Sequence, residues 1–500
     1  MNRQNVLLAL AASVTTGLVM LAVPALGQLA APPTTAPVFP PAPPAAESIV
    51  REVPRSQADL TQSFAPVVRQ TAPAVVNVYS SVVVQRSNCP YANDPFYAQF
   101  FCRGDTSSTR ERVENSLGSG VIVGEEGVIV TNNHVVEAGD QFRVVLSDRR
   151  EYPASLVMSD ARSDLAVLRI DAPGLSFPTL GFADTRTMQV GDLVLAIGNP
   201  FGVGQTVTSG IVSALARTDV GVSDYASFIQ TDASINPGNS GGALVDMRGR
   251  LVGVNTMIFS KGGGSNGIGF AIPAEMVKRV VDAAVNGGTL VRPWIGAKGQ
   301  SVDSSAAAAL GLDRPQGVLI SEIYPGGPAA RAGLKKGDLV LSIDGREVFD
   351  EKGLKFVAAT KAAGETVSLT VMRDGRRSTL QMKLAPPPGT TEAELKSIEG
   401  RNPFSGAQVA ELSPALAEEL GLDPFRFESG MLVYRVPRGS IASRLGLRPG
   451  DILREVNGAV IRTARDLELS IQKAQSGGAS SIWRLAIERN GERIETSVRI

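Results

Sequence analysis

The C-terminal part of the chain contains one sequence pattern twice. Residues 317–345 match residues 430–458 at a constant offset of 113 residues, without a gap. Both copies hold a short apolar run, an Ala-Gly-Leu or Leu-Gly-Leu turn, a Gly-Asp pair before a second apolar run, and a closing Asp-Gly or Asn-Gly turn. A gapless internal repeat of this length predicts two copies of one structural module. Residues 386–389, which read Pro-Pro-Pro-Gly, predict a linker between the copies.

Residues 63–291 hold many short runs of β-branched and aliphatic residues, separated by turn residues. This spacing predicts an antiparallel barrel or sandwich. The 52 glycines and the aromatic content of only 5% also favour a turn-rich β protein over a helical bundle. Residues 274–284 have a helical apolar spacing, and residues 85–112 lack any aliphatic run and predict a long polar loop. The expected strands are residues 74–78, 120–123, 128–130, 142–146, 165–170 and 193–197.

The N-terminus has the features of an export signal. Arg3 is followed by a mostly apolar stretch, residues 6–23, and then by the small residues Ala25 and Gly27 around a cleavage position. We expect cleavage after Gly27, which makes residues 1–27 a signal peptide. An uncleaved membrane anchor is the alternative, because a stretch of about 18 residues is at the short limit for a membrane span. Residues 28–62, rich in Pro and Ala, predict a disordered linker.

The chain has two cysteines, Cys89 and Cys102. Export would place them in an oxidising compartment, where a pair of cysteines tends to form a disulfide. A loop of this size would stabilise the fold by roughly 3 kcal/mol in the chain-entropy model. We therefore expect a Cys89–Cys102 disulfide, with two free thiols as the alternative.

His134 is the only histidine in the chain. A site that needs two histidine ligands is therefore excluded, and we expect neither a metal centre nor a cofactor. The 49 basic and 49 acidic residues give a formal net charge of zero, so no basic surface for nucleic acid is expected. Any chemistry that depends on an imidazole must use His134.

Ser240 lies in the glycine-rich segment Gly-Asn-Ser-Gly-Gly, residues 238–242. A serine nucleophile needs a base, a carboxylate that orients the base, and N–H donors for the oxyanion. Asp164, which opens an apolar run, is the candidate carboxylate, and the chain order His, Asp, Ser is that of the chymotrypsin arrangement. Ser119 is a weaker candidate nucleophile, because it precedes His134 and leads directly into a predicted strand. Asp160, Asp171 and Asp192 are the alternative carboxylates.

These residues resemble the HtrA (Do-like, DegP-type) family of serine proteases from Ser63 to the C-terminus. The matching motifs are residues 131–136, 163–168, 198–202 and 230–244. The resemblance implies a mainly β protein, with a chymotrypsin-like double β-barrel protease domain followed by two PDZ domains. It implies His134 as the base, Asp164 as the orienting carboxylate and Ser240 as the nucleophile. It also implies an oxyanion hole made by the backbone of Gly238, Asn239 and Ser240.

The repeated module looks like a PDZ domain, whose loop amides bind the carboxylate of a peptide C-terminus while the peptide adds as a strand. The corresponding loop residues are Ile295, Gly296 and Ala297 in the first module, and Phe404, Gly406 and Ala407 in the second. Ser405 is polar at a position that is commonly apolar, so we expect carboxylate binding in the second module less than in the first. The expected domains are a protease domain at residues 63–291, PDZ domain 1 at 292–385, a linker at 386–400 and PDZ domain 2 at 401–500.

The resemblance implies a periplasmic, ATP-independent serine endopeptidase that degrades misfolded envelope proteins. Its expected partners are unfolded polypeptides, peptide C-termini and further copies of the same chain in a trimer-based assembly. No nucleic acid is expected, and membrane contact is expected only if the N-terminal segment stays uncleaved. Two alternatives stay open: a chaperone or scaffold that cleaves little, and an anchored sensor protease triggered by one peptide C-terminus.

Overall fold

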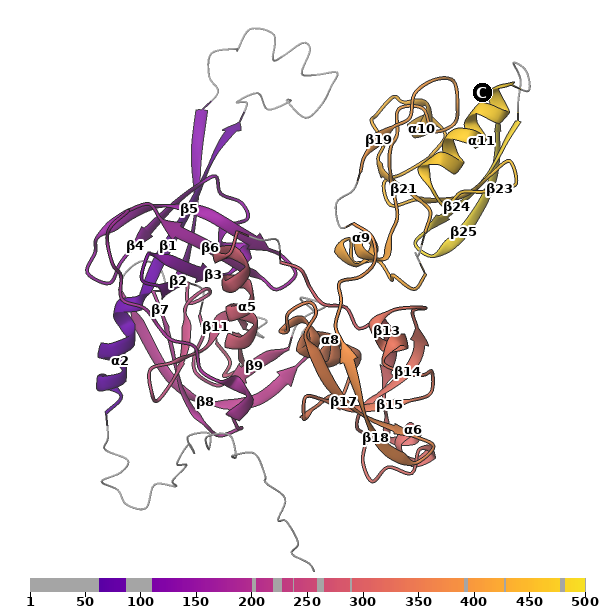
Figure 1. The fold of residues 1–500 in the computed structure, drawn as a ribbon. Coiled ribbons are helices and arrows are strands. Elements are labelled where there is room, and N and C mark those ends of the chain that lie inside the picture. Colours follow the sequence, from indigo (N-terminus) through magenta and orange to yellow (C-terminus); the bar gives the residue numbers. More distant parts are fainter. Residues whose placement is uncertain are drawn as a thin grey trace, which may run out of the picture. The chain divides into compact units, whose positions relative to one another are not determined.

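The fold is described from a computed structural model (Figure 1). The structure describes residues 63–86, 110–199, 204–218, 227–236, 238–258, 265–287, 290–390, 394–426, 429–476 and 482–499. The predicted signal peptide, the predicted linker at 28–62 and the predicted Cys89–Cys102 disulfide lie outside the described residues and remain predictions. Within the described chain, no helix has both the length and the apolar character needed to cross a membrane.

Residues 75–273 contain two closed six-stranded antiparallel barrels, as the resemblance implies. The first barrel has the strand order β1-β2-β3-β6-β5-β4, and the second has the order β10-β11-β12-β9-β8-β7. The first comprises β1 (Val75–Arg86), β2 (Arg110–Gly124), β3 (Val128–Thr131), β4 (Gln141–Val145), β5 (Glu151–Asp160) and β6 (Leu165–Ile170). The second comprises β7 (Leu193–Gly198), β8 (Thr206–Arg217), β9 (Phe228–Thr231), β10 (Ala243–Asp246), β11 (Leu251–Ile258) and β12 (Gly269–Pro273).

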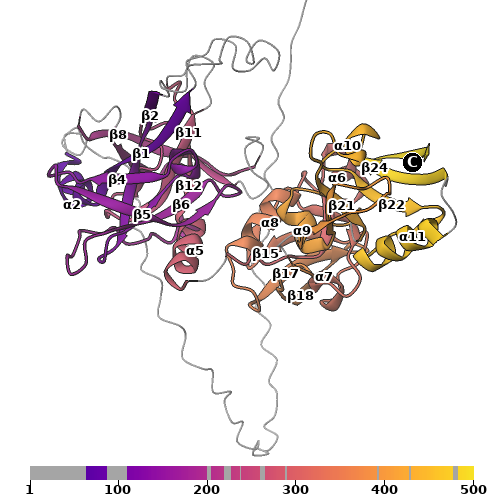
Figure 2. The ribbon, with the colours of Figure 1, turned by 90° about the horizontal axis from the view of Figure 1, so that it is seen from above.

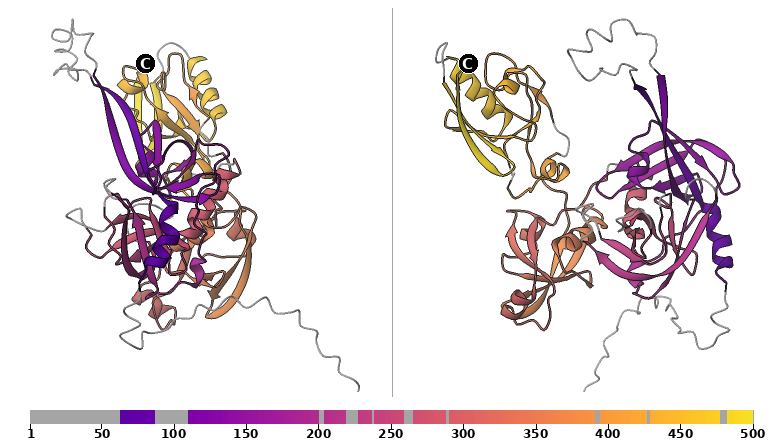
Figure 3. Two further views of the ribbon diagram at one scale, coloured as in Figure 1. Left: turned by 90° about the vertical axis from the view of Figure 1, so that its left-hand side faces the viewer. Right: turned by 180° about the vertical axis from the view of Figure 1, so that it is seen from behind.

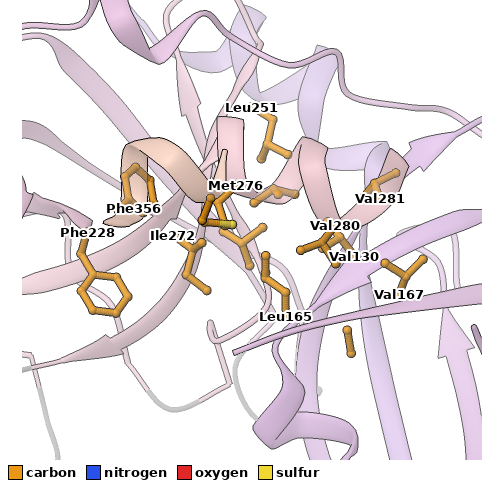
Figure 4. Close-up of a cluster of buried hydrophobic side chains, with 14 of the residues drawn as sticks. Val130, Leu165, Val167, Phe228, Leu251, Ile272, Met276, Val280, Val281 and Phe356 are labelled. Carbon is orange, nitrogen blue, oxygen red and sulfur yellow. The ribbon is translucent and has the colours of Figure 1, made fainter. Parts of the chain in front are cut away.

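The helix α5, Ala274–Val285, packs against both barrels. Its apolar residues recur at helical spacing, so that Met276, Val277, Val280 and Val281 are all buried on one face. Figure 4 shows this face beside side chains of β3, β6 and β12. Burying each such side chain contributes roughly 1.5–3 kcal/mol. Shorter helices precede the barrels or connect their strands: α2 (Ala65–Thr71), η1 (Ala72–Ala74), α4 (Asn133–Val136) and η2 (Thr185–Thr187).

All six expected strands and the expected helix are present, but one expected loop is shorter than predicted. Strand β1 continues to Arg86 and β2 starts at Arg110, and the two pair without interruption from Val75↔Val121 to Arg86↔Arg110. The resulting hairpin projects beyond the first barrel (Figure 3). Strand pairing continues there through residues that are polar or charged in the sequence, so the missing aliphatic residues were a poor guide to where the strands end.

The repeated segments form two similar modules, each built on one antiparallel sheet. The first contains β13 (Ala297–Ser301), β14 (Val318–Ile323), β15 (Leu339–Ile343), β16 (Arg346–Glu347), β17 (Thr366–Arg373) and β18 (Arg376–Lys383), with α6 (Ser304–Ala309), α7 (Pro328–Arg331) and α8 (Glu351–Ala359). The second contains β20 (Gln408–Glu411), β21 (Met431–Arg435), β22 (Ile452–Val456), β23 (Ala459–Val460), β24 (Ile482–Arg489) and β25 (Glu492–Arg499), with α9 (Pro414–Glu419), α10 (Ile441–Arg444) and α11 (Ala464–Ser476). Helix α11 lies beside the strands of its own sheet (Figure 2).

The repeated Gly-Asp pair has the same structural role in both modules. The Asp338 carboxylate, almost fully buried, accepts hydrogen bonds from Arg373 Nε and from the Lys335 N–H at 2.6 and 2.7 Å. Asp451 accepts the corresponding bonds from Arg489 Nε and the Arg448 N–H. A buried carboxylate is tolerated because the guanidinium neutralises it and the backbone donor satisfies it. The carboxylate therefore fixes the turn before β15 or β22 onto the last long hairpin of each sheet.

One element of the second module has no counterpart strand in the first. Strand β19, Lys396–Ser397, pairs antiparallel with β20 in the register Lys396↔Val409 and Ser397↔Gln408. In the first module, β13 is the last strand of its sheet and pairs with β14 alone. Strand β19 lies within the range expected to be the linker, residues 386–400.

Candidate active site

His134 and Asp164 lie close together because they flank the ends of two paired strands. Strand β3 pairs with β6 in the register Thr131↔Ala166, His134 follows β3 on helix α4, and Asp164 directly precedes β6. The turn before β6 places Asp164 in the left-handed region at φ 54°, a conformation that Asp adopts more readily than most residues. Asn132 Nδ2 donates to the Asp164 carbonyl at 2.9 Å and holds this turn against the start of α4.

The Asp164 carboxylate has three donors. His134 Nδ1 lies 2.9 Å from both of its oxygens, and the His134 backbone N–H donates to Oδ1 at 3.1 Å. Thr256 Oγ1, from β11 of the second barrel, donates to Oδ2 at 2.6 Å. With Nδ1 donating to Asp164, Nε2 is the nitrogen that can accept a proton, which is the tautomer that a general base needs.

Thr256 was not found by sequence reasoning. A threonine within an apolar run carries no chemical signature, and it reaches Asp164 only because β11 belongs to a barrel that closes beside the first. The Asp160 carboxylate, a competing candidate, accepts hydrogen bonds from the Ser163 N–H and hydroxyl. Asp171 accepts from Ser155 Oγ at 2.9 Å. Of the candidate carboxylates, Asp164 is the one that contacts His134.

The charge environment of His134 favours its protonated form. Desolvation by burial, the largest single contribution, lowers the pKa of His134. The hydrogen bond from Nδ1 to Asp164, the negative charge of Asp164 and that of Glu137 together outweigh this, so the pKa of His134 lies above its ordinary value.

We expect kcat/KM to rise with pH, with its inflection above the ordinary imidazole pKa of about 6.5. The sign follows from the role of the base, because only neutral His134 can accept a proton, and the raised pKa moves its deprotonation to higher pH. The measurement is the pH–rate profile of peptide hydrolysis under conditions in which chemistry limits the rate. Because the chain has one histidine, the NMR signal of the imidazole Cε1 proton in an inactive Ser240→Ala form reports the pKa independently. A flat profile between about pH 5 and 8 would contradict the role of His134.

Ser240 lies between β9 and β10, where the second barrel meets the first. Its carbonyl accepts a hydrogen bond from the Ser119 N–H on β2 at 2.8 Å. Its hydroxyl donates to the Thr256 carbonyl at 3.0 Å. Within the described chain no hydrogen bond joins this hydroxyl to His134, so rotation about the Ser240 Cα–Cβ bond must precede proton transfer. Apo proteases often hold this pair loosely until substrate binds.

The turn around Ser240 leaves two N–H groups unused. Gly238 and Gly241 have φ values of 97° and 84°, which L-residues rarely adopt. A Cβ on Gly241 would also lie 2.0 Å from the Ser119 carbonyl oxygen, so only glycine fits there. Among the described residues, the N–H groups of Gly238 and Ser240 donate no hydrogen bond. The other N–H groups of the turn are occupied: Asn239 donates to Asn236, Gly241 to Asn255 and Gly242 to Asn239.

Comparisons with known proteins identify the domain families and relatives of this chain. Residues 118–254 match the trypsin-like peptidase domain family, and residues 293–384 and 432–489 each match a PDZ domain family. The probable periplasmic serine endoprotease DegP-like of Brucella suis biovar 1 is 41% identical over 382 residues, covering 76% of this chain and 73% of the relative. The periplasmic serine endoprotease DegP of Escherichia coli K12 is 35% identical over 442 residues, covering 84% and 90%.

The chain belongs to the DegP-type (HtrA) family of serine endoproteases. A solved structure titled HtrA-type protease AlgW with decapeptide is 43% identical, with a TM-score of 0.49, and the match covers 66% of this chain and all of that one.

The first PDZ loop presents unused backbone donors. Gly296 has φ 70°, and its carbonyl accepts from the Tyr324 N–H at 2.9 Å. The Ile295 carbonyl accepts from the Ala329 N–H at 2.9 Å, which anchors the loop to the start of α7. In the described residues, the N–H groups of Ile295 and Gly296 donate no hydrogen bond. Ala297 opens the edge strand β13 directly after them.

The backbone N–H groups of the second PDZ loop donate hydrogen bonds to other atoms of the same module. Gly406, with φ 86°, donates to the Ile398 carbonyl at 2.8 Å, and Ala407 donates to the Phe404 carbonyl at 2.9 Å. Asn402 accepts hydrogen bonds from the N–H groups of Phe404 and Ser405. All four N–H groups from Phe404 to Ala407 are therefore occupied, whereas two in the first loop are available.

Proposed function

We propose that this DegP-type chain is an exported, periplasmic endopeptidase that cleaves misfolded or damaged proteins without ATP. The observation that carries the proposal is the pairing of His134 Nδ1 with Asp164 at 2.9 Å beside Ser240 and its two available N–H groups. The test is cleavage of one protein in two forms, reduced and alkylated or with native disulfides intact. We expect the unfolded form to be cut and the native form to persist. Equal cleavage of both forms would contradict the proposed preference for unfolded substrates.

The proposed reaction proceeds through an acyl-enzyme. His134 Nε2 takes the Ser240 hydroxyl proton as Oγ bonds to the scissile carbonyl carbon, and the carbonyl oxygen becomes an oxyanion. The N–H groups of Gly238 and Ser240 are the proposed oxyanion donors; the Asn239 N–H already donates to Asn236. His134 then returns the proton to the leaving amine as the C–N bond breaks. Water, deprotonated by His134, hydrolyses the ester and regenerates the Ser240 hydroxyl.

We propose that the first PDZ module captures peptide C-termini by adding them to β13. The loop N–H groups of Ile295 and Gly296 would bind the carboxylate, and the edge of β13 that does not face β14 would pair with the peptide backbone. The peptide would have to share this region with Asp423, which pairs with Lys298, and with Phe425, which packs against Trp294. At this edge the Gly299 N–H donates to Glu351 Oε2, on α8, at 3.2 Å. A peptide that pairs along β13 must displace this carboxylate. The cost in binding free energy is modest, because Glu351 can keep its ion pair with Lys355 when it leaves the Gly299 N–H.

The corresponding groove of the second module is filled by the chain itself. Strand β19 runs antiparallel to β20 and toward the loop, the direction in which a captured peptide would run. Ile398, which follows β19, is buried in a cluster that includes Phe404, Leu467 and Ile471. Lys396 Nζ contacts Glu468 on α11, so the segment lies along this helix as well. We therefore propose that the second module binds no peptide C-terminus and serves assembly.

A peptide with a free C-terminus should bind the full-length Ser240→Ala form at one site per chain, and its C-terminal amide should bind at least about tenfold more weakly. The loss reflects the charge-assisted hydrogen bonds that an amide cannot accept. Calorimetry measures both affinity and stoichiometry. The Glu351→Ala variant, which frees the Gly299 N–H, should bind the same peptide a few-fold more tightly. Two sites per chain would contradict the filled second groove, and equal affinity for the amide would contradict carboxylate capture.

The trimer-based assembly implied by family membership is also part of the proposal. Light scattering on the full-length Ser240→Ala form, with and without an unfolded substrate, would give the size of the assembly and its change on substrate binding. We expect a mass near three chains or a multiple of three. A monomer under both conditions would contradict it.

A further inference from the structure

Ser119, set aside as a nucleophile on its sequence position, connects the two barrels at the catalytic turn. It lies on β2 of the first barrel and is fully buried. Its hydroxyl donates to the Gly238 carbonyl at 2.6 Å and accepts from the Asn199 N–H at 2.9 Å. Its own N–H donates to the Ser240 carbonyl at 2.8 Å. One side chain and its amide thus hold two carbonyls of the turn that carries the nucleophile.

These two carbonyls flank the peptide group whose N–H belongs to Ser240. A peptide group is planar, so fixing its carbonyl fixes the orientation of the whole group. The Gly238 carbonyl belongs to the group before Asn239, and the Ser240 carbonyl belongs to the group after Ser240. The group between them carries the Ser240 N–H. Its own carbonyl, that of Asn239, accepts from the Gly242 N–H at 2.9 Å, and the two anchored neighbours restrict the dihedral angles that it can adopt.

The turn needs such a restraint because glycine stands on both sides of it. Gly238 and Gly241 lack a Cβ and can reach backbone conformations closed to other residues, so the chain alone would not hold one arrangement. The Gly238 N–H is joined to its anchored carbonyl through two rotatable bonds of one such glycine. Holding the carbonyl removes most of this freedom before substrate arrives, and oxyanion donors are effective when they are oriented in advance.

We propose that Ser119 is a positioning residue that keeps the Gly238 and Ser240 N–H groups oriented toward the oxyanion. It does not contact the substrate in this role. The hydroxyl is required because it donates to one barrel segment and accepts from another at once, which neither alanine nor valine can do. The close approach of the backbones supports the assignment: a Cβ on Gly118, beside Ser119, would lie 2.7 Å from Val135 and 3.3 Å from the Ser240 carbonyl oxygen.

The test is the Ser119→Ala variant of the full-length chain. We expect kcat for a small chromogenic peptide to fall about ten- to a hundredfold, with KM changed by less than about threefold, because the oxyanion exists only after attack begins. The affinity of a peptide boronate, which forms a tetrahedral anion on Ser240, should fall by the same factor. The pH inflection assigned to His134 should stay where it is, because Ser119 contacts neither His134 nor Asp164.

Thr131→Val is the matched control. The Thr131 hydroxyl is equally buried, lies beside Gly241 and donates to the Ser119 carbonyl at 2.7 Å, but among the described residues it forms no hydrogen bond with the turn. We expect this variant to lower the melting temperature about as much as Ser119→Ala while kcat changes by less than about threefold. Equal loss of kcat in both variants, a shifted pH inflection in Ser119→Ala, or an unchanged boronate affinity would overturn the proposal.

A second variant guards against a failure of Ser119→Ala to fold. Ser119→Cys keeps a weak donor and acceptor at the same position, so it should fold and lose less of kcat than alanine. A Ser119→Cys protein with unchanged kcat and boronate affinity would overturn the proposal, because the longer and weaker thiol contact cannot hold the Gly238 carbonyl in the same way. The two proposals can fail separately. An active Ser240→Ala form would contradict the proposed nucleophile, whereas the results listed for the Ser119 variants would contradict only the role of Ser119.

Discussion

Replacing Ser240 by alanine should lower the rate of casein digestion by about four to six orders of magnitude. The change removes the atom that attacks the carbonyl and leaves only the oxyanion donors and substrate binding. The fold should be unaffected, because the lost hydroxyl makes a single hydrogen bond among the described residues. That bond is to the Thr256 carbonyl, and the Ser240 side chain is only partly buried. The measurement is release of acid-soluble peptides over hours at high enzyme concentration, with circular dichroism as the check on folding.

Ser209→Ala is the control for this experiment. Ser209 is an exposed serine on β8 of the same barrel, and its loss should leave the rate within twofold. Binding of unfolded casein by the Ser240→Ala form should persist, because Ser240 is not part of the proposed peptide-binding groove. Digestion by Ser240→Ala at the rate of the unmodified protein would show that another residue is the nucleophile.

Replacing Asp164 by asparagine should lower kcat by about four orders of magnitude with little change in KM. The amide has the size of the carboxylate but no charge to stabilise the imidazolium. It can also present an N–H to His134 Nδ1, which would stabilise the wrong tautomer and leave a proton on Nε2. In the unmodified protein the Thr256 hydroxyl and the His134 backbone N–H donate to different oxygens of the carboxylate. The asparagine amide has only one oxygen, so it cannot accept both hydrogen bonds in the same way. The measurement is steady-state hydrolysis of a chromogenic peptide.

Asp171→Asn is the matched control, since Asp171 lies at the other end of β6 and bonds only to Ser155 among the described side chains. It should leave kcat within twofold. A loss in Asp171→Asn as large as that in Asp164→Asn would point to a general effect on the first barrel. A retained tenth of the activity in Asp164→Asn would contradict the proposed role of the carboxylate.

Local sequence patterns predicted the elements whose stability is local. The strands around residues 128–130 and 165–170 are short apolar runs, and helix α5 follows from spacing alone. Equivalent elements of the two modules also start 113 residues apart. Strands β15 and β22 begin at Leu339 and Ile452, and helices α7 and α10 begin at Pro328 and Ile441. These patterns succeed because each reflects burial of nearby side chains against a common core.

The parts of the site that sequence did not reveal depend on contacts between distant segments. Thr256 reaches Asp164, and Ser119 reaches Gly238, only because two separately closed barrels meet at one edge. Threonine and serine are common residues, and their hydroxyls acquire a role from the partner they meet. Strand β19 falls within the predicted linker because that prediction rested on the Pro-Pro-Pro-Gly segment at residues 386–389, and a strand of two residues leaves no pattern of its own. Its place in the sheet is set by the strand it pairs with.

Because β19 belongs to the same chain as β20, it competes with free peptides for pairing with that strand. A segment joined to its own groove by a short loop competes at an effective concentration in the millimolar range, whatever the concentration of the protein. A free peptide with micromolar affinity for the empty groove would need to be far more abundant than its dissociation constant to displace β19. We therefore expect the two modules of one chain to differ in their response to ligand concentration, with the first binding peptide at low concentrations at which the second stays closed.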